Sequence, residues 1–240
     1  MEGVGGSIPL APTRSPSFSA GWHRGLVRVL RSFATLVALV LAITGAAGAQ
    51  TLGPLGPVDD GIVKYFISPP LEEAAARPAD TDLAVWAFES WQRVLGGALK
   101  FVRVTNENDA LVRLYWVPAA GGQYGEMRPL DVQGRRGAAV YIRPDTTALG
   151  PDIAAQARLD ALFRDTVVYL TCVHEIGHAL GLPHTAEFAD IMYFFGFGGD
   201  IPAFFGRYRV GLRTRADIQG TAGLSEADIE RLRTLYPAAR

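Results

Sequence analysis

Three of the four histidines in this 240-residue chain lie within the segment HEIGHALGLPH, which runs from position 174 to 184. His174 and His178 are four residues apart, so on a helix they lie on one face, about one turn from each other. Gly181 favours the left-handed conformation that often ends a helix. A chain that reverses there brings His184 back toward the first two histidines. The segment therefore predicts a helix ending at Gly181, with three imidazoles near one point.

This arrangement is typical of a zinc site. Imidazole nitrogens bind Zn²⁺ at about 2.0–2.1 Å, and a catalytic zinc has three protein ligands and one open position. We predict that His174, His178 and His184 bind one catalytic Zn²⁺. Glu175 lies beside the first ligand and is predicted to reach a water on the metal, as general base. The alternative is a surface helix with scattered histidines, which leaves unexplained why no histidine occurs elsewhere after position 49.

Composition excludes several other classes of protein. Cys172 is the only cysteine, which excludes an intramolecular disulfide and a cysteine-rich zinc finger; we expect it to be a small buried hydrophobe. The formal net charge is −1, without the basic stripe of a nucleic-acid binder. We therefore predict no nucleic-acid partner.

The first 49 residues have the composition of a secretory leader. A basic patch at 24–31 precedes an apolar run at 33–43, and small residues follow at 44–50, with a predicted cleavage site after Ala49. The alternative is an uncleaved membrane anchor, but a spanning helix needs about 20 apolar residues. We predict an N-terminal extension and signal peptide over 1–49, and a secreted domain over 50–240 with no stable membrane association after cleavage.

Hydrophobic periodicity divides residues 50–240 into strands and helices. Strands are predicted at 61–67, 99–104, 110–117 and 138–144, and helices at 80–96, 152–165, 166–181 and 224–237. Residues 118–137 are predicted to be irregular. Asp80 or Thr81 is the expected N-cap of the first helix, and Ser225 that of the last. Strands dominate the first half and helices the second, which indicates a single α+β domain.

The eleven-residue motif, followed by a methionine in ADIMY (189–193), resembles the signature of the metzincin metallopeptidases. Within that clan the chain is most similar to the matrixins. AFESWQRV (87–94), HEIGHALGLPHT and LSEADIERLRTLYP (224–237) resemble the family's first helix, zinc helix and C-terminal helix. The resemblance implies a twisted, mostly parallel sheet of four to five strands with an active-site helix and a C-terminal helix.

The resemblance also implies roles for residues around the motif. Met192 is expected to pack beneath the zinc ligands, and Asp228 to brace the turn that carries it. Phe194 stands where astacin-like enzymes carry a zinc-reaching tyrosine. A structural Ca²⁺ is not indicated, and no cysteine-based latency is expected. Residues 194–223 form a Phe- and Gly-rich insert that either lines a pocket or covers core.

The function expected from the resemblance is secreted, zinc-dependent endopeptidase activity. Glu175 would act as general base and then general acid toward a zinc-activated water. The substrate would be a protein or peptide, lying along an edge strand at 138–144, and the enzyme a monomer. One alternative is a catalytically inactive, secreted zinc-binding homologue. Another is a zinc aminopeptidase of a different clan, whose third ligand is a distant glutamate.

Overall fold

The computed structural model describes residues 53–56 and 58–237, and the predicted leader at 1–49 lies outside them. Five strands form one sheet in the spatial order β2-β1-β3-β5-β4. Their bounds are β1 (Ile62–Ile67), β2 (Lys100–Arg103), β3 (Val112–Trp116), β4 (Gly125–Val132) and β5 (Arg135–Ile142). All pairs are parallel except that of β4 with β5. The predicted α+β fold with a mostly parallel sheet is confirmed.

The prediction that residues 118–137 are irregular was wrong, and so was the assignment of 138–144 as the edge strand. The strand at this edge of the sheet is β4, which is joined to β5 by a two-residue turn, and β2 lies at the opposite edge. Gln133 and Gly134 in this turn have φ of 55° and 75°, as a type I′ hairpin requires. Pro129 disrupts the alternating pattern of a strand, but a proline is tolerated where its missing N–H faces an open edge. Ala138, opposite Pro129, donates its N–H to Leu111 on the β3 side, so this pair is not hydrogen-bonded.

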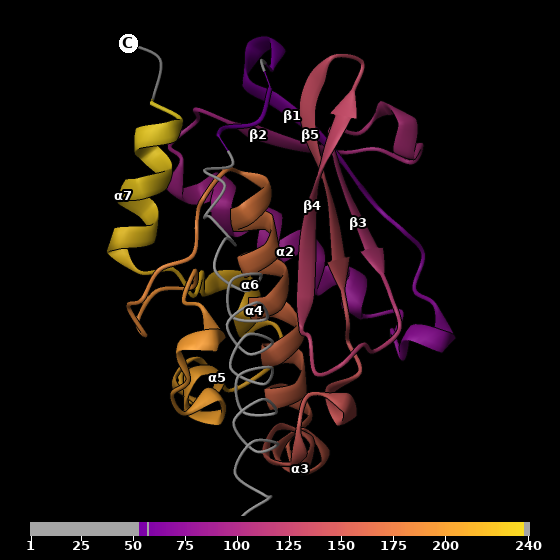
Figure 1. Cartoon of the computed structure of the whole chain (residues 1–240), viewed down its shortest axis with the longest axis vertical. Helices are drawn as coiled ribbons and strands as arrows, with labels where there is room; N and C mark the ends of the chain where they lie inside the picture. The colour runs from indigo at the N-terminus through magenta and orange to yellow at the C-terminus, as the bar shows by residue number, and fades with distance from the viewer. Residues whose placement is uncertain (1–52, 57, 238–240) are drawn as a thin grey trace, which may run out of the picture. The chain divides into compact units, whose positions relative to one another are not determined.

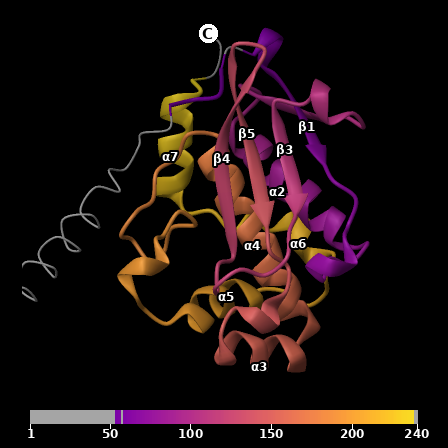
Figure 2. The same ribbon diagram turned by 45° about the vertical axis from the view of Figure 1, so that its right-hand side comes forward.

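Helices pack on one face of this sheet. The helices are α2 (Asp80–Val94), α3 (Pro151–Leu159), α4 (Ala161–Ala179), α5 (Ile201–Arg209), α6 (Asp217–Gly220) and α7 (Glu226–Leu235). Short 3₁₀ turns are η1 (Asp59–Gly61), η2 (Glu72–Ala74), η3 (Glu107–Asp109), η4 (Thr146–Ala148) and η5 (Phe195–Phe197). Helices α2 and α4 pack together, α4 contacts β4 and β5, and α5 packs against α4 (Figures 1 and 2). No helix among the described residues has the length and apolarity needed to cross a membrane.

One predicted helix start is displaced, and the predicted N-cap of another helix was wrong. The break between α3 and α4 lies at Asp160 rather than after residue 165, because the Asp160 side chain accepts hydrogen bonds from the N–H groups of Leu162 and Phe163. Helix α2 starts at Asp80 without a side-chain cap, so neither Asp80 nor Thr81 is its N-cap. Ser225 caps α7 as predicted, in a reciprocal capping box with Asp228.

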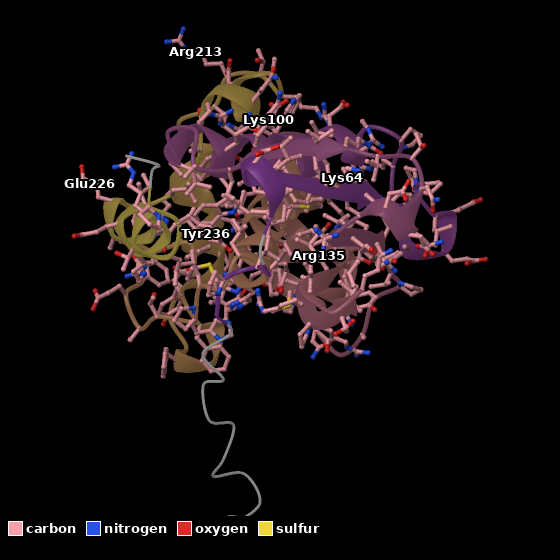
Figure 3. All side chains as sticks on the ribbon, turned by 90° about the horizontal axis from the view of Figure 1, so that it is seen from above. Lys64, Lys100, Arg135, Arg213, Glu226 and Tyr236 are labelled. Carbon is pink, nitrogen blue, oxygen red and sulfur yellow. The ribbon has the colours of Figure 1, made fainter. Side chains whose placement is uncertain are left out.

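Tyr236, just after α7, links both ends of the described domain to the end of helix α4. Its hydroxyl accepts from the Leu55 N–H at 2.8 Å and donates to the Leu180 carbonyl, directly after α4, at 2.9 Å. Figure 3 shows Tyr236 nearer the middle of the molecule, whereas the charged side chains of Arg213 and Glu226 lie at its periphery. The end of α4 is thereby held at a fixed place.

Asp80 is not available as a cap because it takes part in a buried ion pair. Arg164 of α4 donates from both terminal nitrogens to the Asp80 carboxylate, at 2.8 Å from Nη2 to Oδ2. The two side chains are only 3% and 1% exposed. The pair joins the start of α2 to the first turns of α4. A charge left alone at such depth is strongly destabilising.

The variant Arg164→Met should therefore lower the free energy of unfolding by about 3–5 kcal/mol, since it leaves the Asp80 carboxylate buried and unpaired. Denaturant unfolding measures this directly. Arg128→Met is the matched control, because Arg128 pairs with Glu126 at the surface, where its side chain is 63% exposed. It should change the free energy of unfolding much less. Equal losses in the two variants would contradict the importance of the buried pair.

Candidate metal centre

Helix α4 and the turn that follows it bring the three histidines together. His174 and His178 lie one turn apart in the last two turns of α4, which ends at Ala179. Gly181 then adopts φ of 102°, a conformation that L side chains rarely adopt. The Leu182 N–H returns to the Gly177 carbonyl at 3.0 Å, which closes the reversal. His184 is consequently brought next to His178, although its side chain stays exposed to solvent.

The ring nitrogens have the spacing that a tetrahedral metal needs. His178 Nε2 and His184 Nε2 are 3.1 Å apart. One nitrogen from each of His174, His178 and His184 lies within 4.8 Å of the others. Zinc with bonds of 2.0–2.1 Å would place its ligand nitrogens about 3.4 Å apart. Small ring movements therefore suffice for these three residues to hold one Zn²⁺.

Two backbone carbonyls orient the rings. His174 Nδ1 lies 2.6 Å from the Ile191 carbonyl, and His178 Nδ1 lies 2.8 Å from the Leu182 carbonyl. A carbonyl can only accept, so each Nδ1 carries the proton and each Nε2 keeps its lone pair. Burial lowers the pKa of His174 to about 3 and that of His178 to about 4. Both imidazoles are thus neutral near pH 7, the form that binds metal.

Glu175 lies beside this cluster as a buried carboxyl group. It is 6% exposed, and its Oε2 has no hydrogen-bond partner among the described residues. Burial raises the pKa of Glu175 to about 8, against the opposing positive charge of Arg143. A cation held by the imidazoles would favour the charged carboxylate. The unpaired oxygen beside three neutral imidazoles therefore fits a site built for a cation.

The start of the edge strand passes directly beside Glu175. A Cβ at Gly125 would lie 2.6 Å from Glu175 Cγ, so only glycine allows this approach. Arg143, just after β5, is nearly buried, and its Nε and Nη1 have no hydrogen-bond partner in the part of the chain that the structure describes. Gly125 and Arg143 were not predicted as part of the site. The hairpin that places Gly125 there was not recognised, and no local pattern marks Arg143.

Met192 packs against the helix from below, as the resemblance implies. It is fully buried, and a Cβ at Gly177 would lie 2.5 Å from its sulfur. Gly177, which lies between His174 and His178 in the sequence, therefore leaves space for the Met192 side chain. Thr185 N–H donates to the Met192 carbonyl at 2.9 Å, and Phe194 N–H donates to the Thr185 carbonyl at 3.0 Å. These bonds fix the segment after His184 to the turn.

Helix α7 braces that turn, as expected for Asp228. The Ile191 N–H donates to Asp228 Oδ2 at 2.8 Å. Arg231 pairs with Asp228 at 2.8 Å and with Asp190 at 2.6 Å. Asp190 and Arg231 were not predicted, although the three-residue spacing of Asp228 and Arg231 on a helix could have indicated a pair.

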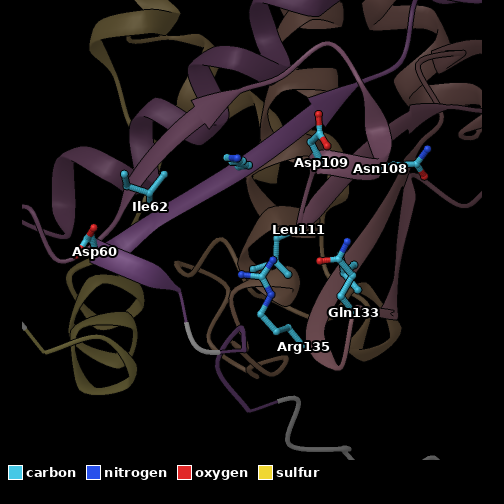
Figure 4. Close-up of a pocket in the computed structure, with 9 residues that line it drawn as sticks. Asp60, Ile62, Asn108, Asp109, Leu111, Gln133 and Arg135 are labelled. Carbon is cyan, nitrogen blue, oxygen red and sulfur yellow. The ribbon is translucent and has the colours of Figure 1, made fainter.

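A separate pocket of about 350 Å³ lies near the start of β1 and the β4–β5 turn (Figure 4). Asp60, Lys64, Asp109 and Arg135 supply charges of both signs around it. None of the three histidines lines it. The charges of opposite sign select no particular ligand, so the histidine cluster stays the candidate site.

Comparisons with known proteins agree with this geometry. Residues 62–197 match the sequence profile of the M10 peptidases, described as matrixin. A protein of Trichoplusia ni ascovirus 2c, named "Putative matrix metalloproteinase", is 28% identical over 122 residues, covering 44% of this chain and 23% of that protein. The chain thus spans about a quarter of that relative's length. Because the profile match extends over more than half of the chain and includes the whole histidine cluster, this chain belongs to the matrixin family.

Proposed function

We propose that this chain is a zinc-dependent endopeptidase. His174, His178 and His184 would hold one Zn²⁺, and Glu175 would be the general base and acid. The proposal is supported by two observations: three imidazoles whose nitrogens converge, and a buried carboxyl oxygen on the next residue after His174 that has no hydrogen-bond partner within the described part of the chain. Membership of a peptidase family supports a protein or peptide as substrate.

When bound, zinc supplies a Lewis acid that polarises the scissile carbonyl and makes water more acidic. Glu175 then moves the protons. Its carboxylate takes a proton from the attacking water and returns it to the leaving amine. Because Oε2 has no other hydrogen-bond partner among the described residues, it does not share that proton with a competing group. The surrounding burial keeps bulk water away from the transfer.

The substrate would bind along β4, the edge strand, rather than along 138–144. Ile142 accepts a hydrogen bond from Val117 on the β3 side, and Ala138 donates to the same side. Their partners in the register, Gly125 and Pro129, therefore direct their peptide groups to the open edge, and so does Met127 between them. The outward peptide groups of Gly125, which lies against Glu175, and of Met127 can hold an extended peptide by strand addition. Pro129 offers no N–H and limits that pairing.

Secretion of the enzyme stays a prediction. It depends on the predicted signal peptide at 1–49, which lies outside the described residues. A monomeric state and the absence of a nucleic-acid partner likewise stay predictions. We propose that the enzyme acts on its substrates after export.

The variant Glu175→Gln keeps the shape of the side chain and removes the base. Cleavage of casein and of peptides should fall by about 10²–10⁴-fold, the contribution of a positioned acid–base group. Zinc content, measured by atomic absorption, should be unchanged. Glu230→Gln, on the exposed side of α7, is the matched control and should keep full activity.

Wild-type cleavage by the Glu175→Gln variant would show that another group is the base. If the wild-type chain bound zinc stoichiometrically and cleaved nothing, the inactive zinc-binding homologue would be the better description. A zymogram with and without a chelator separates these two outcomes.

The variant His184→Ala removes the ligand that the reversal at Gly181 brings back. Zinc affinity should fall by more than about a hundredfold, because loss of a ligand's hydrogen-bond partner alone typically costs 10–100-fold. Competition with a chromogenic chelator measures the affinity. The Glu175→Gln variant serves as control, since it should bind zinc like the wild type. Unchanged affinity in His184→Ala would exclude His184 from the ligand set.

A further inference from the structure

Helix α5, in the Phe- and Gly-rich insert, is anchored to the rest of the domain by contacts that do not involve Arg207. Its side chains Phe204 and Phe205 are buried in the core. Arg209 pairs with Asp160, the N-cap of α4, with 2.7 Å between Nε and Oδ2. Arg207 is the other cationic residue of α5, and it makes a different contact.

Arg207 contacts the loop that precedes the turn carrying Met192. Its guanidinium donates from Nη1 to the Phe188 carbonyl and from Nη2 to the Ala189 carbonyl, the second at 3.1 Å. The same group lies over two aromatic rings, 4.3 Å from the Phe204 centroid and 5.4 Å from that of Phe188. A guanidinium is a planar fork that can bind two acceptors and also stack on aromatic faces. Arg207 therefore joins α5 to this loop.

The carbonyls that Arg207 binds lie shortly before the one that orients His174. The nearer of the two belongs to Ala189. Two residues further along the chain, the Ile191 N–H donates to Asp228 of α7 at 2.8 Å. The Ile191 carbonyl then lies 2.6 Å from His174 Nδ1. The backbone is therefore held first by α5 and then by α7, directly before it contacts the ring of His174.

Without Arg207 this stretch keeps its hydrogen bonds to α7 and loses those to α5. From α7, Asp228 holds the Ile191 N–H and Arg231 pairs with Asp190. A segment held by one helix can still turn about those bonds, because each residue keeps two soft dihedral angles. Hydrogen bonds to a second helix restrict that motion. Since Arg207 is an exposed residue, water and salt weaken its contacts, and we expect an effect of modest size.

We propose that Arg207 is a positioning residue for the metal cluster, because it fixes the loop whose Ile191 carbonyl orients His174. The inference rests on the proposed zinc-dependent function, and it gives α5 a part in that function. In this role Arg207 needs no contact with the metal or the substrate. It acts through the hydrogen bond that keeps the proton on Nδ1 of His174 and leaves Nε2 free for the metal.

The test compares Arg207→Met with Arg209→Met in the full chain. Methionine keeps much of the alkyl chain of arginine and removes the guanidinium. The dissociation constant for zinc, measured by competition with a chromogenic chelator, should rise about three- to tenfold in Arg207→Met, less than the 10–100-fold typical for loss of a ligand's direct partner. Arg209→Met is the matched control, because it weakens the attachment of the same helix to Asp160. It should leave the dissociation constant unchanged.

A second measurement needs no metal. The nitrogen chemical shifts of the His174 ring, measured by NMR on zinc-free protein, report which of the two nitrogens carries the proton. The wild type should hold the proton on Nδ1, which lies against the Ile191 carbonyl. Arg207→Met should shift the ring toward a mixture of the two forms, whereas Arg209→Met should not. A merely structural role of Arg207 would lower the melting temperature without changing the ring.

The variant Arg207→Lys serves as the conservative replacement. An ammonium group is a point charge without the planar fork, so lysine should restore only part of the zinc affinity and of the wild-type ring state. If Arg207→Met does not fold, this variant carries the comparison. Wild-type values of both quantities in Arg207→Lys would then contradict the role of the fork.

Two further results would overturn the proposal. One is a zinc affinity and a ring state in Arg207→Met equal to those of the wild type. The other is an equal loss in Arg207→Met and Arg209→Met, which would show that the anchoring of α5 matters and the contact to the loop does not. If the wild-type chain binds no zinc, the proposed function fails, and the ring state of His174 in zinc-free protein still decides the role of Arg207.

Discussion

Two backbone carbonyls, those of Ile191 and Leu182, decide which way the imidazoles of His174 and His178 face. An imidazole on a helix is free to turn about two side-chain bonds, and either of its two nitrogens can carry the proton until one of them finds a hydrogen-bond partner. Each carbonyl accepts a hydrogen bond from Nδ1–H and so leaves the Nε2 lone pair free to bind a metal. Without these two hydrogen bonds the three histidines would still lie close together, but their metal-binding nitrogens would not point to one place.

The position of the Ile191 carbonyl is itself set by groups far along the chain. The Ile191 N–H is held by Asp228, which α7 supplies and Arg231 supports. Met192 fills the space next to Gly177, and this packing sets the distance between the turn that carries Met192 and helix α4. Tyr236 fixes the end of α4 from the same C-terminal segment. The C-terminal helix, which contributes no group to the metal cluster, therefore contributes to the orientation of His174.

The sequence predicted most accurately those features that depend on short spacings. The histidine cluster and the cap at Ser225 each lie within about eleven residues, where helix geometry relates position to direction. The features it missed depend on distant partners. From the sequence alone Asp80 resembles a helix cap, but in the structure it pairs with Arg164. The strand at 125–132 contains Pro129, which fits a strand only because its missing N–H faces the open edge, as the hydrogen bond of Ala138 to the other side shows. Because that strand was not predicted, the position of Gly125 beside Glu175 was not predicted either.

The charges of the histidine cluster and Glu175 couple the stability of the fold to the binding of a metal ion. Burial makes the imidazoles poor bases and makes the Glu175 carboxyl group a weak acid, so without a cation the site is held mostly as neutral groups. A divalent ion among the imidazoles reverses the balance for Glu175, because nearby positive charge favours the carboxylate. The same ion binds the folded arrangement and not the unfolded chain, so it also stabilises the fold. Among the described residues, Arg143 supplies positive charge near Glu175, and its effect on the Glu175 pKa is smaller than that of burial. The carboxylate that the proposed chemistry needs would therefore come from the positive charge of a bound metal, which opposes the effect of burial on the Glu175 pKa.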